Sequence, residues 1–79
     1  MRVVREFTKD GLRLSIFQWN NKYLVKYEFG PMEQTFKLPE TDVLDEADLD
    51  AFFEGEFFDR VKERFKEMGD NLQKQLENF

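Results

Sequence analysis

The chain has 79 residues, of which 37% are charged and 16% are aromatic. This length predicts one domain, residues 1–79, whose small core depends on its aromatic rings. The chain has no cysteine and no histidine, which excludes disulfides, thiolate nucleophiles, histidine bases and the usual zinc ligands.

The net charge of −5 is distributed unevenly along the chain. Residues 1–38 contain seven Lys or Arg and four Asp or Glu, whereas residues 39–79 contain five and thirteen. An acidic total argues against a broad nucleic-acid footprint. The sequence has no apolar run of signal-peptide or membrane-spanning character, so we expect a cytoplasmic protein with no membrane partner.

Four segments of alternating apolar and polar residues predict four β-strands. They are separated by Asp10-Gly11, Asn20-Asn21 and Gly30-Pro31, which are typical of two-residue hairpin turns. Such short turns join antiparallel neighbours, so residues 1–38 are predicted to form a four-stranded antiparallel meander. The predicted strands are Arg2–Thr8, Leu12–Trp19, Lys22–Phe29 and Met32–Leu38.

Two-residue turns also fix which residues lie opposite one another in neighbouring strands. They place Leu14 opposite Tyr27, and they bring the apolar positions of all four strands to one inner face. Arg5, Gln18 and Gln34 are polar exceptions on this face, and Arg5 is expected to extend its guanidinium to the rim. The apolar residues predicted on the inner face are Val3, Phe7, Leu12, Leu14, Ile16, Tyr23, Val25, Tyr27, Phe29, Met32, Phe36 and Leu38.

The acidic segment 39–79 has its apolar residues at helical spacing. Gly55 lies where the phase of this pattern changes, and glycine lowers helix propensity. We therefore expect a short helix near 45–54, a kink or break at Gly55 and a long helix near 56–78 that covers the inner face. The predicted fold class is α+β: a four-stranded antiparallel meander with a C-terminal helix packed on one face.

The other face of the predicted sheet combines bases with apolar side chains, and the register places Trp19 between Arg2 and Lys22. One interpretation is a platform on which bases of single-stranded nucleic acid stack. A second is a surface for a protein partner, and a third is a purely structural cross-strand cluster in which Trp19 makes cation–π contacts. The candidate interaction face comprises Arg2, Val4, Phe17, Trp19, Lys22, Leu24, Lys26 and Lys37.

The predicted long helix exceeds the strands in length. Twenty-three helical residues span about 35 Å and an eight-residue strand about 26 Å, so the helix should extend past the sheet by about a turn and a half. Leu72, Leu76 and Phe79 are apolar in this overhang and form a candidate dimer patch. A second copy of the chain is the simplest cover for it. The alternatives are that the short helix folds beneath it or that its end frays.

Catalytic and metal-binding motifs are not found. Nine residues from Glu40 to Asp59 are acidic and none is basic, but the spacing of a calcium loop is missing. We interpret this run as helix caps and a solvated face that is able to attract a basic partner. No nucleophile elbow or phosphate-binding loop is present. The sequence therefore predicts no enzyme activity, no cofactor and no metal.

The order of four antiparallel strands and a long helix resembles the general plan of single-stranded nucleic-acid binders of the PUR-repeat type. The stretch TFKLPE, residues 35–40, is loosely similar to their last strand. The resemblance implies a sheet that binds single-stranded nucleic acid and helices that dimerise. This chain is acidic and lacks a dense basic stretch, so no functional residue is carried over from those proteins. Two hypotheses follow: a non-enzymatic protein-interaction or assembly module that binds another protein or itself, and a weak single-stranded nucleic-acid binder.

Overall fold

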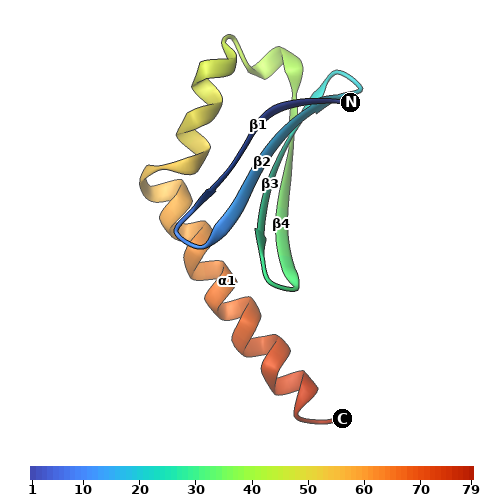
Figure 1. Cartoon of the computed structure of the whole chain (residues 1–79), viewed down its shortest axis with the longest axis vertical. Helices are drawn as coiled ribbons and strands as arrows, with labels where there is room; N and C mark the ends of the chain where they lie inside the picture. The colour runs from blue at the N-terminus through green and yellow to red at the C-terminus, as the bar shows by residue number, and fades with distance from the viewer.

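The computed structural model describes residues 1–79 as one open antiparallel sheet followed by a helical segment (Figure 1). The strands are hydrogen-bonded in the order β1-β2-β3-β4, which confirms the predicted α+β meander. Asp10-Gly11 and Asn20-Asn21 have positive φ at both residues, as a type I′ turn requires. The elements are β1 (Arg2–Lys9), β2 (Leu12–Trp19), β3 (Lys22–Phe29), β4 (Met32–Pro39), the 3-10 helices η1 (Glu40–Asp42) and η2 (Glu46–Phe53), and α1 (Gly55–Leu76).

Most of the predicted register is present. Leu14 pairs with Phe7 of β1 and with Tyr27 of β3, while Val25 pairs with Phe36 of β4. These pairs lie on one face, because side chains alternate along each strand. The two central strands therefore supply the sheet's share of the buried core: Leu12, Leu14, Ile16, Tyr23, Val25 and Tyr27.

A β-bulge in β1 changes the register of its first residues. Val3 pairs with Phe17 and Arg5 pairs with Ile16, so Val4 is an extra residue on this strand. Val4 packs against the core and Val3 is exposed. The prediction that Val4 lies on the outer face and Val3 on the inner face was wrong, because two adjacent valines fit either alternation.

The same bulge turns Arg2 towards the covered side of the sheet. Arg2 pairs with Gln18, and its Nη2 donates to the side-chain oxygen of Gln18 at 2.6 Å and to the carboxylate of Glu46 at 2.7 Å. The predicted position of Arg2 beside Trp19 was therefore wrong. The hydrogen bond from Arg2 lowers the pKa of Glu46 below its ordinary value.

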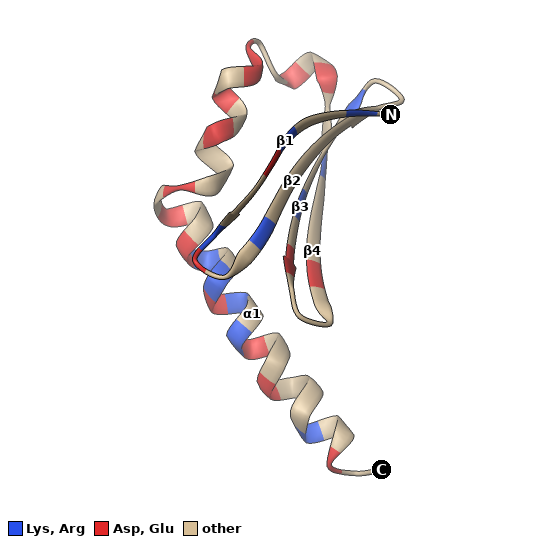
Figure 2. Cartoon of the chain, viewed as in Figure 1, with Lys and Arg blue, Asp and Glu red and all other residues tan.

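The bulge aligns three bases of β1 along the covered side of the sheet, where η2 lies against them. Figure 2 shows that acidic residues are concentrated on η1 and η2. The basic first half and the acidic second half of the sequence thus meet at this contact. Arg5, which was expected to reach only the solvent-exposed rim, pairs with Asp50. The contacts are Arg2 to Glu46 at 2.7 Å, Arg5 to Asp50 at 2.8 Å and Lys9 Nζ to the carbonyl oxygen of Phe53 at 2.8 Å.

The helical segment is interrupted where the sequence predicts. Asp45 caps η2 by accepting a hydrogen bond from the backbone N–H of Ala47 at 3.0 Å. Glu54 is extended and Gly55 has a φ of +67°, so the chain turns before α1 continues. The predicted break at Gly55 is confirmed, but the first helix is a 3-10 helix. No helix has both the length and the apolar character needed to cross a membrane.

Tyr27 lies at the centre of the core and is fully buried. Its ring contacts Phe53 of η2 at 5.7 Å and Phe58 of α1 at 6.3 Å between centroids. Its hydroxyl donates a hydrogen bond to the carbonyl oxygen of Phe52 at 2.6 Å. Burial raises the pKa of Tyr27 above its ordinary value. One tyrosine thus joins the sheet to both helices that cover it.

The part of α1 up to Met68 packs against the sheet and its core. Gln34 Nε2 donates to the carbonyl oxygen of Val61 at 3.0 Å, and the rings of Phe29 and Phe65 lie 5.9 Å apart. Gln34, a polar exception on the inner face, thus fastens α1 to β4. The C-terminal turns of α1 extend past the ends of the strands (Figure 1), and the molecule is 46 Å long.

Candidate interaction surfaces

The open face of the sheet has an apolar area at its end near the Asn20-Asn21 turn. We call it the outer patch: Met1, Val3, Phe17, Trp19 and Leu24. Val3, Phe17 and Leu24 lie side by side across three strands, so Val3 takes the place predicted for Val4. Trp19 is 54% exposed and Val3 is 53% exposed. The predicted apolar area of this face is therefore present with one residue exchanged.

Trp19 has no internal partner that explains its position. The cation–π contacts in the structure are those of Lys9 and Lys62 over the ring of Phe58, at 5.2 and 4.7 Å. The aromatic pairs all involve rings on the covered side of the sheet. The cation–π contact predicted for Trp19 is not formed. The bulge places Arg2 on the other face, and Lys22 pairs with Trp19 in register without lying over its ring.

Several bases of the open face are neutralised by carboxylates. Lys26 Nζ lies 3.6 Å from Glu28 and 3.4 Å from Glu33. Arg13 forms an ion pair with Glu6 of β1. Of the lysines in the predicted face, Lys22 and Lys37 lack a carboxylate partner. The field on this face is therefore only weakly positive.

The outer patch borders a shallow depression of about 320 Å³. Phe17, Leu24 and Lys26 form part of its lining, and Thr35 and Glu33 of β4 form its far side. Phe17 and Leu24 are half-buried, so their side chains form its apolar floor. Apolar residues with a charged rim are the usual composition of the centre of a protein interface.

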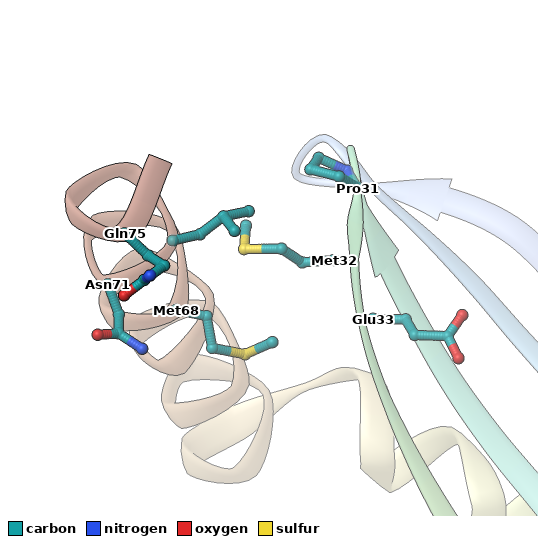
Figure 3. A pocket seen from close by; sticks show the side chains of 7 residues that line it. Pro31, Met32, Glu33, Met68, Asn71 and Gln75 are labelled. Atoms are coloured by element: carbon teal, nitrogen blue, oxygen red, sulfur yellow. The ribbon is translucent and has the colours of Figure 1, made fainter. Parts of the chain in front are cut away.

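The candidate dimer patch lies at the end of α1 that leaves the sheet. The helix ends at Leu76, two residues earlier than predicted, so Phe79 lies beyond it. Leu72, Leu76 and Phe79 are 38%, 51% and 92% exposed. Leu72 lines a cleft of about 510 Å³ with Met32 and Met68, between α1 and the first residues of β4 (Figure 3). In Figure 3 the two methionines point across the cleft between the strand and the helix. Neither η1 nor η2 folds beneath this patch, so that alternative to the dimer is wrong.

A third surface was missed by the sequence interpretation. It is a hollow of about 260 Å³ where β4 is followed by η1 and η2, and we call it the η1–η2 hollow. Leu44 is 97% exposed beside it. The available signal was the apolar pair Val43-Leu44 with an aspartate on either side, outside any helical period. The lining residues are Leu38, Asp42, Val43, Leu44, Asp48, Leu49 and Phe52.

The structure brings few reactive groups together. Ser15, the single serine, is 2% exposed although it lies on the open face. No group of three or more carboxylates lies close enough to hold a metal ion. The chemistry available at these surfaces is therefore burial of apolar side chains and pairing of charges.

Comparison of the chain with known protein families, with curated proteins and with solved structures finds no match. The resemblance to the PUR-repeat plan rests on the order of the elements and on the short stretch TFKLPE.

Proposed function

We propose that this chain is a small, non-enzymatic protein-interaction module of the cytoplasm, and that a protein partner binds the outer patch. The observation that carries the proposal is the exposure of Trp19, which has no aromatic or cationic partner within the chain. Trp19 lies outside the core that is folded around Tyr27, so it contributes little to the stability of that core. A large ring of this kind contributes strongly to affinity when a partner covers it.

The charges of the open face support a protein partner over a nucleic acid. A protein that binds single strands needs bases that are free to contact phosphates. Here Arg2 is engaged by Glu46 on the covered side and Lys26 is engaged by Glu28 and Glu33. A protein partner needs no net positive field, so the same pairs do not oppose it.

The test is site-specific photo-crosslinking in cells that express the protein. A photoreactive phenylalanine analogue replaces Trp19, and a matched variant carries it at Glu67 on the exposed face of α1. We expect a discrete crosslinked protein for position 19 that is missing for position 67. Leu24→Glu in the position-19 variant should remove it, because the new carboxylate lies in the apolar floor of the patch.

Two results would overturn this proposal. The first is a failure to crosslink at position 19, or equal products at both positions. The second is a product that nuclease removes, together with Trp19 fluorescence that is quenched by poly-dT or poly-U and recovers steeply with salt. The second result would establish the nucleic-acid hypothesis in its place.

Self-association through the dimer patch is a second candidate, and exposure of the overhang favours it. Leu76, the last residue of α1, and Phe79, which follows the helix, are both more than half exposed beyond the sheet. Two copies that pack these helices together would bury the same apolar surface twice. The cleft between Met32 and Met68 lies beside this surface and is lined by adaptable side chains.

Light scattering over a concentration series tests the dimer. A monomer has a mass of 9.6 kDa, and we expect the apparent mass to rise towards twice this value with concentration. Leu76→Gln should abolish the rise, while Lys74→Gln, which introduces the same side chain on the opposite arc of α1, should preserve it. A constant monomer mass would refute self-association and leave the outer-patch proposal intact.

A further inference from the structure

The η1–η2 hollow has an apolar floor and an exposed apolar side chain at its edge. Leu49, which is buried, and Phe52, which is half-buried, form part of its apolar lining. Val43 packs partly against the core, whereas Leu44 next to it is 97% exposed. A leucine with so little contact contributes almost nothing to the folded state. It is available to cover whatever occupies the hollow.

The rim of this hollow is acidic for a geometric reason. A 3-10 helix has three residues per turn, so side chains three apart lie in one row. Within η2 this places Leu49 and Phe52 in one row, which lines the hollow, and Asp48 in the adjacent row at its edge. Asp42 of η1 adds a carboxylate on the other side of the hollow.

These rim carboxylates lack basic partners within the chain. The bases of β1 engage Glu46 and Asp50, which lie outside the row of Asp48. Asp42 and Asp48 form no ion pair, and no Lys or Arg occurs from Glu40 to Asp59. The hollow therefore combines apolar surface with uncompensated negative charge, and this combination is complementary to a basic amphipathic ligand.

We propose that the η1–η2 hollow binds a basic peptide segment of a partner protein, which inserts one large apolar side chain between flanking lysines or arginines. A hollow of about 260 Å³ lies below the size typical of small-molecule sites, but it suits a single anchoring side chain. Leu44 closes over the anchor, while Asp42 and Asp48 pair with the flanking cations.

Other occupants fit these observations less well. A nucleic acid is repelled by the rim. A metal ion lacks a group of three ligands. The hollow also lies on the covered side of the sheet and the outer patch on the open side, so the two surfaces are independent and can be tested separately.

The test is a titration of the ¹⁵N-labelled protein with a short synthetic peptide in which one leucine stands between pairs of lysines. A peptide of the same length with glutamates in place of lysines is the charge control. We expect the amide signals of Val43, Leu44 and Phe52 to shift on addition of the basic peptide and to stay unchanged with the acidic one. Affinity should fall as salt is added, because the cations pair with exposed carboxylates.

Three variants locate the site. Leu44→Ser should weaken binding about tenfold or more, since the leucine is covered only in the complex. The double variant Asp42→Asn with Asp48→Asn should weaken it about fivefold at low salt. The matched double variant Glu67→Gln with Asp70→Asn, which has the same net charge, should bind as the parent does. All of these side chains are exposed, so the variants are expected to fold.

The proposal is overturned by an undetectable interaction, by equal weakening in the two double variants, or by signal shifts spread evenly over the acidic surface. It is also overturned if the parent protein self-associates and Leu44→Ser abolishes this, because the occupant would then be a second copy.

Discussion

Replacing Tyr27 with phenylalanine tests the contact that joins the sheet to η2. Phenylalanine keeps the ring that fills the core, so no large cavity forms. The variant loses the hydrogen bond from the hydroxyl to the carbonyl oxygen of Phe52, which is 2.6 Å long. Loss of a partly buried hydrogen bond lowers the free energy of unfolding by about 1–2 kcal/mol. For a chain of this size, each kcal/mol corresponds to a decrease in Tm of about 4–8 °C.

Urea unfolding followed by circular dichroism measures this loss, and Tyr23→Phe is the matched control. Tyr23 lies on the same strand and face and is 5% exposed, but its hydroxyl has no hydrogen-bond partner in the protein. We expect Tyr23→Phe to cost less than about 0.5 kcal/mol. If the two variants lose equal stability, the hydroxyl–carbonyl contact does not hold η2 against the sheet and the reasoning is wrong.

The parent protein and the variant Tyr27→Phe are also expected to respond differently to alkaline pH. Burial raises the pKa of Tyr27, so above about pH 10 the unfolded chain releases a proton that the folded chain keeps. The free energy of unfolding of the parent should then fall by up to about 1.4 kcal/mol per pH unit from this group. Tyr27→Phe lacks this contribution, so its difference from the parent should narrow as pH rises. A difference that is constant with pH would contradict the burial of Tyr27.

Three further predictions concern other parts of the molecule. Gly55→Ala should lower the free energy of unfolding, measured with urea, by about 1 kcal/mol, because φ is +67° at this position. Gly69→Ala inside α1 should raise it by about 0.5–1 kcal/mol. Effects of the same sign would contradict the structure. The double variant Glu46→Gln with Asp50→Asn should be less stable at neutral pH. Both carboxylates have lowered pKa values in the folded state, so the greater stability of the parent should disappear as pH falls below their ordinary pKa values of 4.5 and 3.8. A stability difference that persists in acid would show that the ion pairs are not its cause. Trp19→Ser should leave the free energy of unfolding within about 0.5 kcal/mol of the parent, and a larger loss would mean that the outer patch is structural.

The sheet could be predicted from the sequence because its local signals agree with one another. Asp10-Gly11 and Asn20-Asn21 supply the positive φ values of two-residue turns, and the alternation between them keeps one face apolar. The bulge in β1 escaped prediction because Val3 and Val4 are both apolar. The decisive preference is tertiary, since the bulge brings Arg2 to the carboxylates of η2.

The helical segment was predictable in outline but not in detail. Gly55 marked the break correctly, but the residues of η2, Glu46–Phe53, span too few turns for their apolar spacing to distinguish a 3-10 helix from an α-helix. The η1–η2 hollow depends on that distinction, because three residues per turn place Leu49 and Phe52 in the one row that lines it. Exposure of Leu72 and Leu76 followed from comparing helix and strand lengths, and the structure shows the same overhang. The direction in which α1 leaves the sheet depends on Gln34 and on the ring contacts around it.

The overhang of α1 divides the molecule into two regions of different cooperativity. Amide protons of β2 and β3 are expected to exchange with solvent only when the whole protein unfolds, whereas those beyond Leu72 exchange whenever the last turns unwind. Unwinding there leaves the core around Tyr27 untouched. A ligand or second copy that covers Leu76 would slow amide exchange at the end of α1 without altering exchange in the sheet. The exchange rate there therefore shows whether this part of the helix is covered.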